Sequence, residues 1–169
     1  MSEVIPEGWT RNPLTKYCDV VGGGTPDRSV KEYWDGDIPW ISPTEVTSNT
    51  TRFVSRTKEK ITQLGLERSS AKLHPAGSLL MTSRASIGYV AMNTIPMATN
   101  QGFQTLRCKQ GTLAEYLYYY IDSIRPELER ISAGSTFSEI PSSSVKKLEI
   151  TLPPLPEQPV GRTALPDRR

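Results

Sequence analysis

The chain has 169 residues, the length of one domain, since domains usually contain roughly 100 to 200 residues. With 36% hydrophobic and 22% charged residues its composition is that of an ordinary globular protein with a core. Its apolar stretches fall far short of the roughly 20 residues of a membrane helix, and Glu3 and Glu7 do not suit a secretory leader, so we expect a cytoplasmic protein without membrane segments.

The net charge of +2 conceals an uneven distribution. Residues 52–109 carry nine basic and two acidic side chains, a net +7, and the remainder of the chain is net −5. A basic middle is typical of a surface that faces phosphates, because Lys and Arg replace the counterions of a polyanion. A solvated basic face is the alternative.

Taken in chain order, the first half contains loops and aromatic residues. Residues 5–9 (IPEGW) form an entry segment whose Trp packs on the core, and residues 22–26 (GGGTP) form a loop that lacks the Lys-Ser/Thr ending of a nucleotide-binding loop. In residues 33–43 an Asp-Gly turn leads into an extended stretch with two Trp side chains that we expect to be buried, Trp34 and Trp40. A helix is expected over residues 57–73.

The second half alternates between strands and helices. Residues 78–92 read as a strand interrupted at 83–86, and residues 102–108 as another. Thr112 and Glu115 have capping-box spacing and predict the start of an amphipathic helix, Pro126 begins a short helix over 127–131, and residues 148–152 alternate as a half-buried strand. The pattern predicts an α+β fold: a domain over residues 1–152 with a partly antiparallel sheet and a few short helices, then a loose Pro-rich tail over 153–169.

The sequence lacks the residues that several kinds of catalysis require. Cys18 and Cys108 do not have the spacing of a zinc site or a disulfide framework, and His74, the one histidine, is expected in a loop without a catalytic partner. No Asp or Glu has a Lys two positions on, as common metal-dependent nucleases require, and no polar-Pro-Pro-aromatic segment of an amino-group methyltransferase is present. We therefore expect a binding protein with no catalytic or metal site.

Four loops carry small polar residues beside glycine or serine, at residues 42–44, 83–86, 99–101 and 135–138. Asn and Gln can bond an adenine edge, Arg suits guanine, and Ser or Thr can contact base or phosphate. Ordinary turn chemistry explains each loop singly. Together with the basic middle they favour binding to duplex DNA.

Four motifs in order resemble a known family: residues 5–9 (IPEGW), 23–40 (GGTP with YWDGDIPW), 98–102 (ATNQG) and 152–158 (LPPLPEQ). They are similar to the target recognition domain of specificity subunits of type I restriction-modification systems. The resemblance implies a DNA methylase specificity fold that recognises one half of a bipartite duplex target and performs no chemistry. It also implies modification and restriction subunits as partners, which would carry S-adenosylmethionine, ATP and Mg²⁺.

The loops then supply candidate contacts. For base edges the candidates are Ser42, Thr44, Arg84, Asn100, Gln101, Ser135 and Thr136. For phosphates they are Arg28, Lys72 and Lys146. For Asn100, a role in capping the following turn is an equal alternative.

The chain departs from the family after Gln158. Family members continue into a long spacer helix and a second recognition domain, whereas residues 159–169 contain prolines and no heptads. The chain therefore resembles about half a subunit, either a truncated product, a fragment or a half-subunit with a separate partner. Two other hypotheses remain: a nuclease or methyltransferase with an unrecognised site, and a protein-interaction module that uses the aromatic residues around Trp34 and Trp40.

Overall fold

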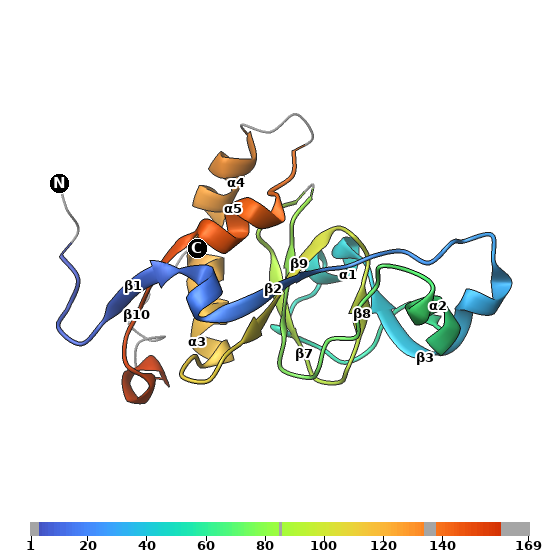
Figure 1. Ribbon diagram of the computed structural model, residues 1–169, viewed down its shortest axis with the longest axis horizontal. Helices are drawn as coiled ribbons and strands as arrows, with labels where there is room; N and C mark the ends of the chain where they lie inside the picture. The colour runs from blue at the N-terminus through green and yellow to red at the C-terminus, as the bar shows by residue number, and fades with distance from the viewer. Residues whose placement is uncertain (1–3, 85, 134–137, 160–169) are drawn as a thin grey trace.

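The computed structural model describes residues 4–84, 86–133 and 138–159. Its strands form sheets of five, three and two strands, and Figure 1 shows the helices α3, α4 and α5 gathered at one end, with α1, α2 and β3 at the other. In chain order the elements are β1 (Thr10–Pro13), η1 (Leu14–Lys16), β2 (Cys18–Gly22), η2 (Lys31–Tyr33), β3 (Trp34–Ile41), α1 (Pro43–Thr47), β4 (Phe53–Val54), β5 (Glu59–Ile61), α2 (Gln63–Glu67), β6 (Leu79–Thr82), β7 (Val90–Asn93), β8 (Ala98–Thr99), β9 (Phe103–Cys108), α3 (Ala114–Ser123), α4 (Arg125–Ala133), α5 (Ser142–Lys147), β10 (Glu149–Leu152) and η3 (Leu155–Glu157).

The five-stranded sheet has the order β2-β9-β6-β7-β4 and is antiparallel except for the β4–β7 pair. It is buried on both faces. Leu79 and Met81 of β6 pack on the helical side, and Leu80 packs on the opposite side, as the two-residue period of a strand requires. The continuous apolar sequence of β6 follows from this position between two cores.

The three-stranded sheet has the order β5-β3-β8, with β3 antiparallel to β5 and parallel to β8. Trp40 is 2% exposed in the small core beneath it and meets Trp34 edge to face, with ring centroids 5.2 Å apart. This sheet matters for the site, because the parallel β3–β8 pair ends both strands at the same edge.

The two-stranded sheet joins the ends of the described chain. β1 pairs antiparallel with β10, and α5 packs on η1 and β2. The apolar faces of α3, α4 and α5 cover the large sheet through Tyr116, Leu117, Ile121, Leu128 and Val145. The expected α+β class is confirmed by this arrangement.

Several local expectations are wrong. The helix expected over 57–73 is replaced by β5 and the five-residue α2, because Ile61 pairs with both Trp34 and Ile38 across an irregular register of β3. The Asp-Gly segment after Trp34 belongs to this irregular part of β3, where Asp35 takes a φ of +61°, and is not a turn before an extended stretch.

The capping box at Thr112 does not form. The N-cap of α3 is Leu113, whose N–H donates to Oε1 of Gln158 at 2.6 Å, and Glu115 pairs instead with Arg52 at 2.8 Å. Gln158 is 1% exposed, so this part of the expected loose tail is packed. None of the helices in the described ranges combines the length and apolar character that crossing a membrane requires.

Candidate nucleic-acid interface

Main-chain hydrogen bonds join five segments of the described chain. The N–H of Gly24 donates to the carbonyl of Thr99 at 3.0 Å, and the N–H of Asn100 donates to the carbonyl of Ile41 at 3.1 Å. These two bonds connect the glycine loop, the end of β3 and the end of β8. We call the assembled segments the loop cluster: residues 23–25, 42–44, 83–84, 100–102 and 138–140.

The remaining segments of the loop cluster are connected in the same way. The N–H of Ser83 donates to the carbonyl of Gly102 at 2.9 Å, and the carbonyl of Ser83 accepts the N–H of Ile140 at 2.9 Å. Five candidate residues from distant parts of the sequence are therefore brought into one cluster. They are Ser42, Thr44, Arg84, Asn100 and Gln101.

The turn at residues 100–102 is closed by its own side chain. Oδ1 of Asn100 accepts the N–H of Gly102 at 2.8 Å, which is an Asx turn and corresponds to the structural alternative for Asn100. A Cβ at Gly102 would lie 2.8 Å from Pro43, so glycine permits the close approach of α1. Gln101 is exposed and accepts a hydrogen bond from the hydroxyl of Thr25. Gln101 therefore presents its amide at the surface.

Ser42 and Thr44 begin α1 but face different surroundings. The N–H and the hydroxyl of Ser42 both donate to Oε2 of Glu45, at 2.8 and 3.0 Å, so Ser42 serves as the cap of α1. Thr44 is exposed, with its hydroxyl 3.4 Å from that of Ser42. Thr44 is thus the better placed of the two for an external partner.

Arg84 extends from the end of β6 and is 47% exposed, with an ion pair of 3.3 Å to Glu139. The candidates Ser135 and Thr136 lie outside the described residues. Glu139 and Thr25 were not among the residues singled out from the sequence. Thr25 lies in the loop cluster because Gly23 approaches Asn100 closely: a Cβ at Gly23 would lie 2.1 Å from the carbonyl oxygen of Asn100. The GGGTP run is the feature of the sequence that could have indicated this approach.

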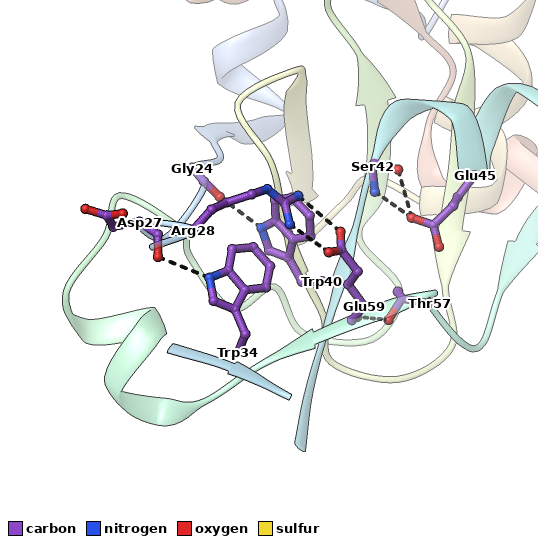
Figure 2. A network of polar contacts seen from close by, with 9 residues as sticks. All are labelled: Gly24, Asp27, Arg28, Trp34, Trp40, Ser42, Glu45, Thr57 and Glu59. Carbon is purple, nitrogen blue, oxygen red and sulfur yellow. Dashed lines mark hydrogen bonds and ion pairs between the residues drawn. The ribbon is translucent and has the colours of Figure 1, made fainter. Parts of the chain in front are cut away.

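Of the three phosphate candidates, Arg28 is held in a network of aromatic and acidic side chains (Figure 2). Its guanidinium donates to both carboxylate oxygens of Glu59, at 2.7 and 3.2 Å, and lies 4.4 Å from the ring of Trp34. The hydrogen bond lowers the pKa of Glu59 and raises that of Arg28. Trp40 donates from Nε1 to the carbonyl of Gly24 at 2.9 Å, so this network supports the glycine loop of the cluster.

The other two phosphate candidates are exposed and lie apart. Lys72 follows the buried Ala71, whose N–H lies against Gly24 on the same flank as Arg28. Lys146 lies in the last turn of α5, which packs on the other end of the molecule with α3 and α4 (Figure 1). The structure thus joins five base-edge candidates but spreads the phosphate candidates over two flanks.

Burial shifts the pKa values of the histidine and of both cysteines. Burial lowers the pKa of His74 to about 4, and Nδ1 accepts the guanidinium of Arg107 at 3.2 and 3.0 Å. Burial also raises the pKa of Cys18 and of Cys108 to about 12, and these free thiols face each other across β2 and β9. Among the described residues no group of three His, Cys, Asp or Glu side chains is placed to hold a metal ion.

The sequence matches a known family over nearly its whole length. A family model described as the type I restriction modification DNA specificity domain matches residues 6–161. The chain belongs to this family. The family match includes the loop cluster and Gln158.

Relatives and solved structures agree with the family match. The chain is 40% identical to the MjaIX specificity subunit of Methanocaldococcus jannaschii, and the match covers 95% of this chain and 38% of the relative. It is 30% identical to the EcoprrI specificity subunit of Escherichia coli, where the match covers 90% of this chain and 38% of the relative. It shares the fold of the HsdS subunit from Thermoanaerobacter tengcongensis, with a TM-score of 0.76 and 21% identity over 97% of this chain and 38% of that one. The chain therefore spans a little over a third of the length of these proteins.

Proposed function

We propose that this specificity domain recognises a short sequence of double-stranded DNA, one half of a bipartite target, and performs no chemistry itself. The observation that carries the proposal is the loop cluster. Main-chain hydrogen bonds hold its polar residues in one place, and Thr44, Arg84 and Gln101 are exposed there. Hydroxyl, guanidinium and amide groups are those that bond base edges in the major groove.

The proposal assigns the reaction to other polypeptides. The relatives are named as specificity subunits of type I restriction enzymes. One solved structure with the same fold comes from work on how the complex of a type I restriction-modification system assembles. We infer that this chain acts with modification and restriction subunits in the cytoplasm. S-adenosylmethionine, ATP and Mg²⁺ would then be bound by those subunits.

A selection from randomised duplexes tests the proposal. We expect the purified chain to enrich one short motif at moderate salt. Gln101→Ala and Thr44→Ala should each change the preference at one position of the motif, because a lost base contact typically costs about 1 to 3 kcal/mol. Gln63→Ala is the matched control, since Gln63 is an exposed glutamine on α2 outside the loop cluster. Failure of the wild-type chain to enrich any motif would contradict the proposal.

A further inference from the structure

A groove lies beside α1. It consists of two hollows that share Asn49. The first includes Phe53, Ser55, Arg56 and the carboxylate of Glu45. The second is lined mainly by hydroxyl, amide and guanidinium groups, among them Thr47, Thr50, Arg52, Tyr118 and Arg125, and it also contains the carboxylate of Asp122. We call the two hollows together the α1 groove.

The α1 groove adjoins the loop cluster through two segments. Helix α1 starts after Ser42 in the cluster and ends at Thr47, which lines the groove. Five residues of helix span about 7.5 Å at 1.5 Å per residue, which is within the roughly 12 Å width of a DNA major groove. The segment that leads from Arg84 to β7 likewise ends at Tyr89 in the groove. A duplex that contacts the cluster would therefore have its backbone near this groove.

Two arginines of the α1 groove are held by aromatic rings and carboxylates. Arg52 lies 4.8 Å from the ring of Phe53 and pairs with Glu115 at 2.8 Å. Arg125 lies 4.2 Å from the ring of Tyr89 and pairs with Asp122.

These ion pairs orient the guanidinium groups without closing them off. The side chains of Arg52 and Arg125 are 32% and 29% exposed, so each guanidinium still reaches the solvent beside its carboxylate. A phosphate can therefore compete with each carboxylate. Arg56, the third arginine, is exposed at the other end of the groove.

We propose that the α1 groove binds the sugar-phosphate backbone next to the loop cluster, with Arg52, Arg56 and Arg125 as phosphate contacts. This inference rests on the proposed function. Arg, Thr, Asn and Tyr are residues that bond phosphate oxygens, and such contacts fix the register of a protein on DNA without reading its sequence. The groove offers them together beside α1, the helix that starts in the loop cluster.

The test is a salt titration of binding to two duplexes, one with the selected motif and one scrambled. Each phosphate contact contributes about 0.9 to the slope of log affinity against log salt concentration. Arg56→Gln should therefore lower the slope by about 0.9 and the affinity by about eightfold at 0.1 M salt, equally for both duplexes. Arg52→Gln and Arg125→Gln should act in the same way.

Arg130→Gln is the matched control. Arg130 is 71% exposed on α4 and pairs with Glu127 at i,i+3, so its loss removes the same charge outside the groove. Because Arg56 is exposed, Arg56→Gln should keep the wild-type melting temperature even if the two packed arginines do not tolerate substitution. Slopes equal to that of Arg130→Gln for all three variants would overturn the proposal.

Two further outcomes separate this inference from the proposed function. A wild-type chain that binds no duplex overturns both. A wild-type chain that enriches a motif, with groove variants that keep its salt slope but lose binding to a modification subunit, leaves the proposed function standing. That result would make the α1 groove a protein interface and refute its role as a phosphate site.

Discussion

Substitution of Gln158 tests the packing between the C-terminal motif and α3. Oε1 of Gln158 accepts the N–H of Leu113 at 2.6 Å, and Nε2 donates to the carbonyls of Gly111 and Pro153 at 2.9 and 3.2 Å. At about 1 kcal/mol for each hydrogen bond, Gln158→Ala should lower the free energy of unfolding by about 3 kcal/mol. For a chain of this length the melting temperature should fall by about 6 to 12 °C.

Two companion variants separate the hydrogen bonds from general effects of substitution. Gln158→Glu retains an acceptor for Leu113 but places a carboxylate against two carbonyl oxygens, so we expect it to be at least as unstable as Gln158→Ala. Gln63→Ala, on the exposed face of α2, should cost less than about 0.5 kcal/mol. Urea unfolding of the full chain measures all three. A Gln158→Ala variant as stable as Gln63→Ala would refute the reasoning.

Three other perturbations have definite expected outcomes. Because burial lowers the pKa of His74 to about 4, His74 is protonated only in the unfolded chain between about pH 6.5 and 4. Acidification through this range should therefore lower the free energy of unfolding by up to about 3 kcal/mol. His74→Gln should not show this loss. Gly23→Ala would place a Cβ 2.1 Å from the carbonyl oxygen of Asn100. It should lower the free energy of unfolding, measured by thermal unfolding, by about 1 to 3 kcal/mol. Cys18 and Cys108, with thiol pKa values raised to about 12, should react with a thiol reagent at pH 8 only after denaturant is added, and rapid labelling of the native chain would contradict this.

The strands were easier to predict from sequence than the short helices. Alternating or continuous apolar residues located β6, β7, β9 and β10 close to their observed bounds, because the period of a strand is set by which side chains face a core. The helical spacing of residues 57–73 was misleading. There Ile61 is drawn into pairing with β3, a contact from more than 20 residues away that outweighs weak local propensity.

The residue types of the candidate site were predictable, but their meeting was not. Polar loops at residues 42–44, 83–84 and 100–101 are visible in the sequence. Their convergence depends on the parallel pairing of Ile41 with Thr99 and on the approach of Gly102 to Pro43, which are long-range contacts. The start of α3 had the same difficulty, since the N–H of its N-cap residue, Leu113, is bonded by Gln158, 45 residues away.

The way the loop cluster is built has a consequence for recognition. Its segments are joined by main-chain hydrogen bonds, and the side chains with clear structural tasks are Ser42, which caps α1, and Asn100, which closes its turn. Thr44 and Gln101 are exposed and carry no such task for the backbone. Substitution of Thr44 or Gln101 should therefore change the DNA sequence that is preferred while leaving the free energy of unfolding within about 0.5 kcal/mol of wild type. Because main-chain hydrogen bonds hold the loop cluster together, exchange of a few exposed side chains can change its specificity without unfolding it. A large loss of stability in Gln101→Ala would show that specificity and stability are not separate in this way.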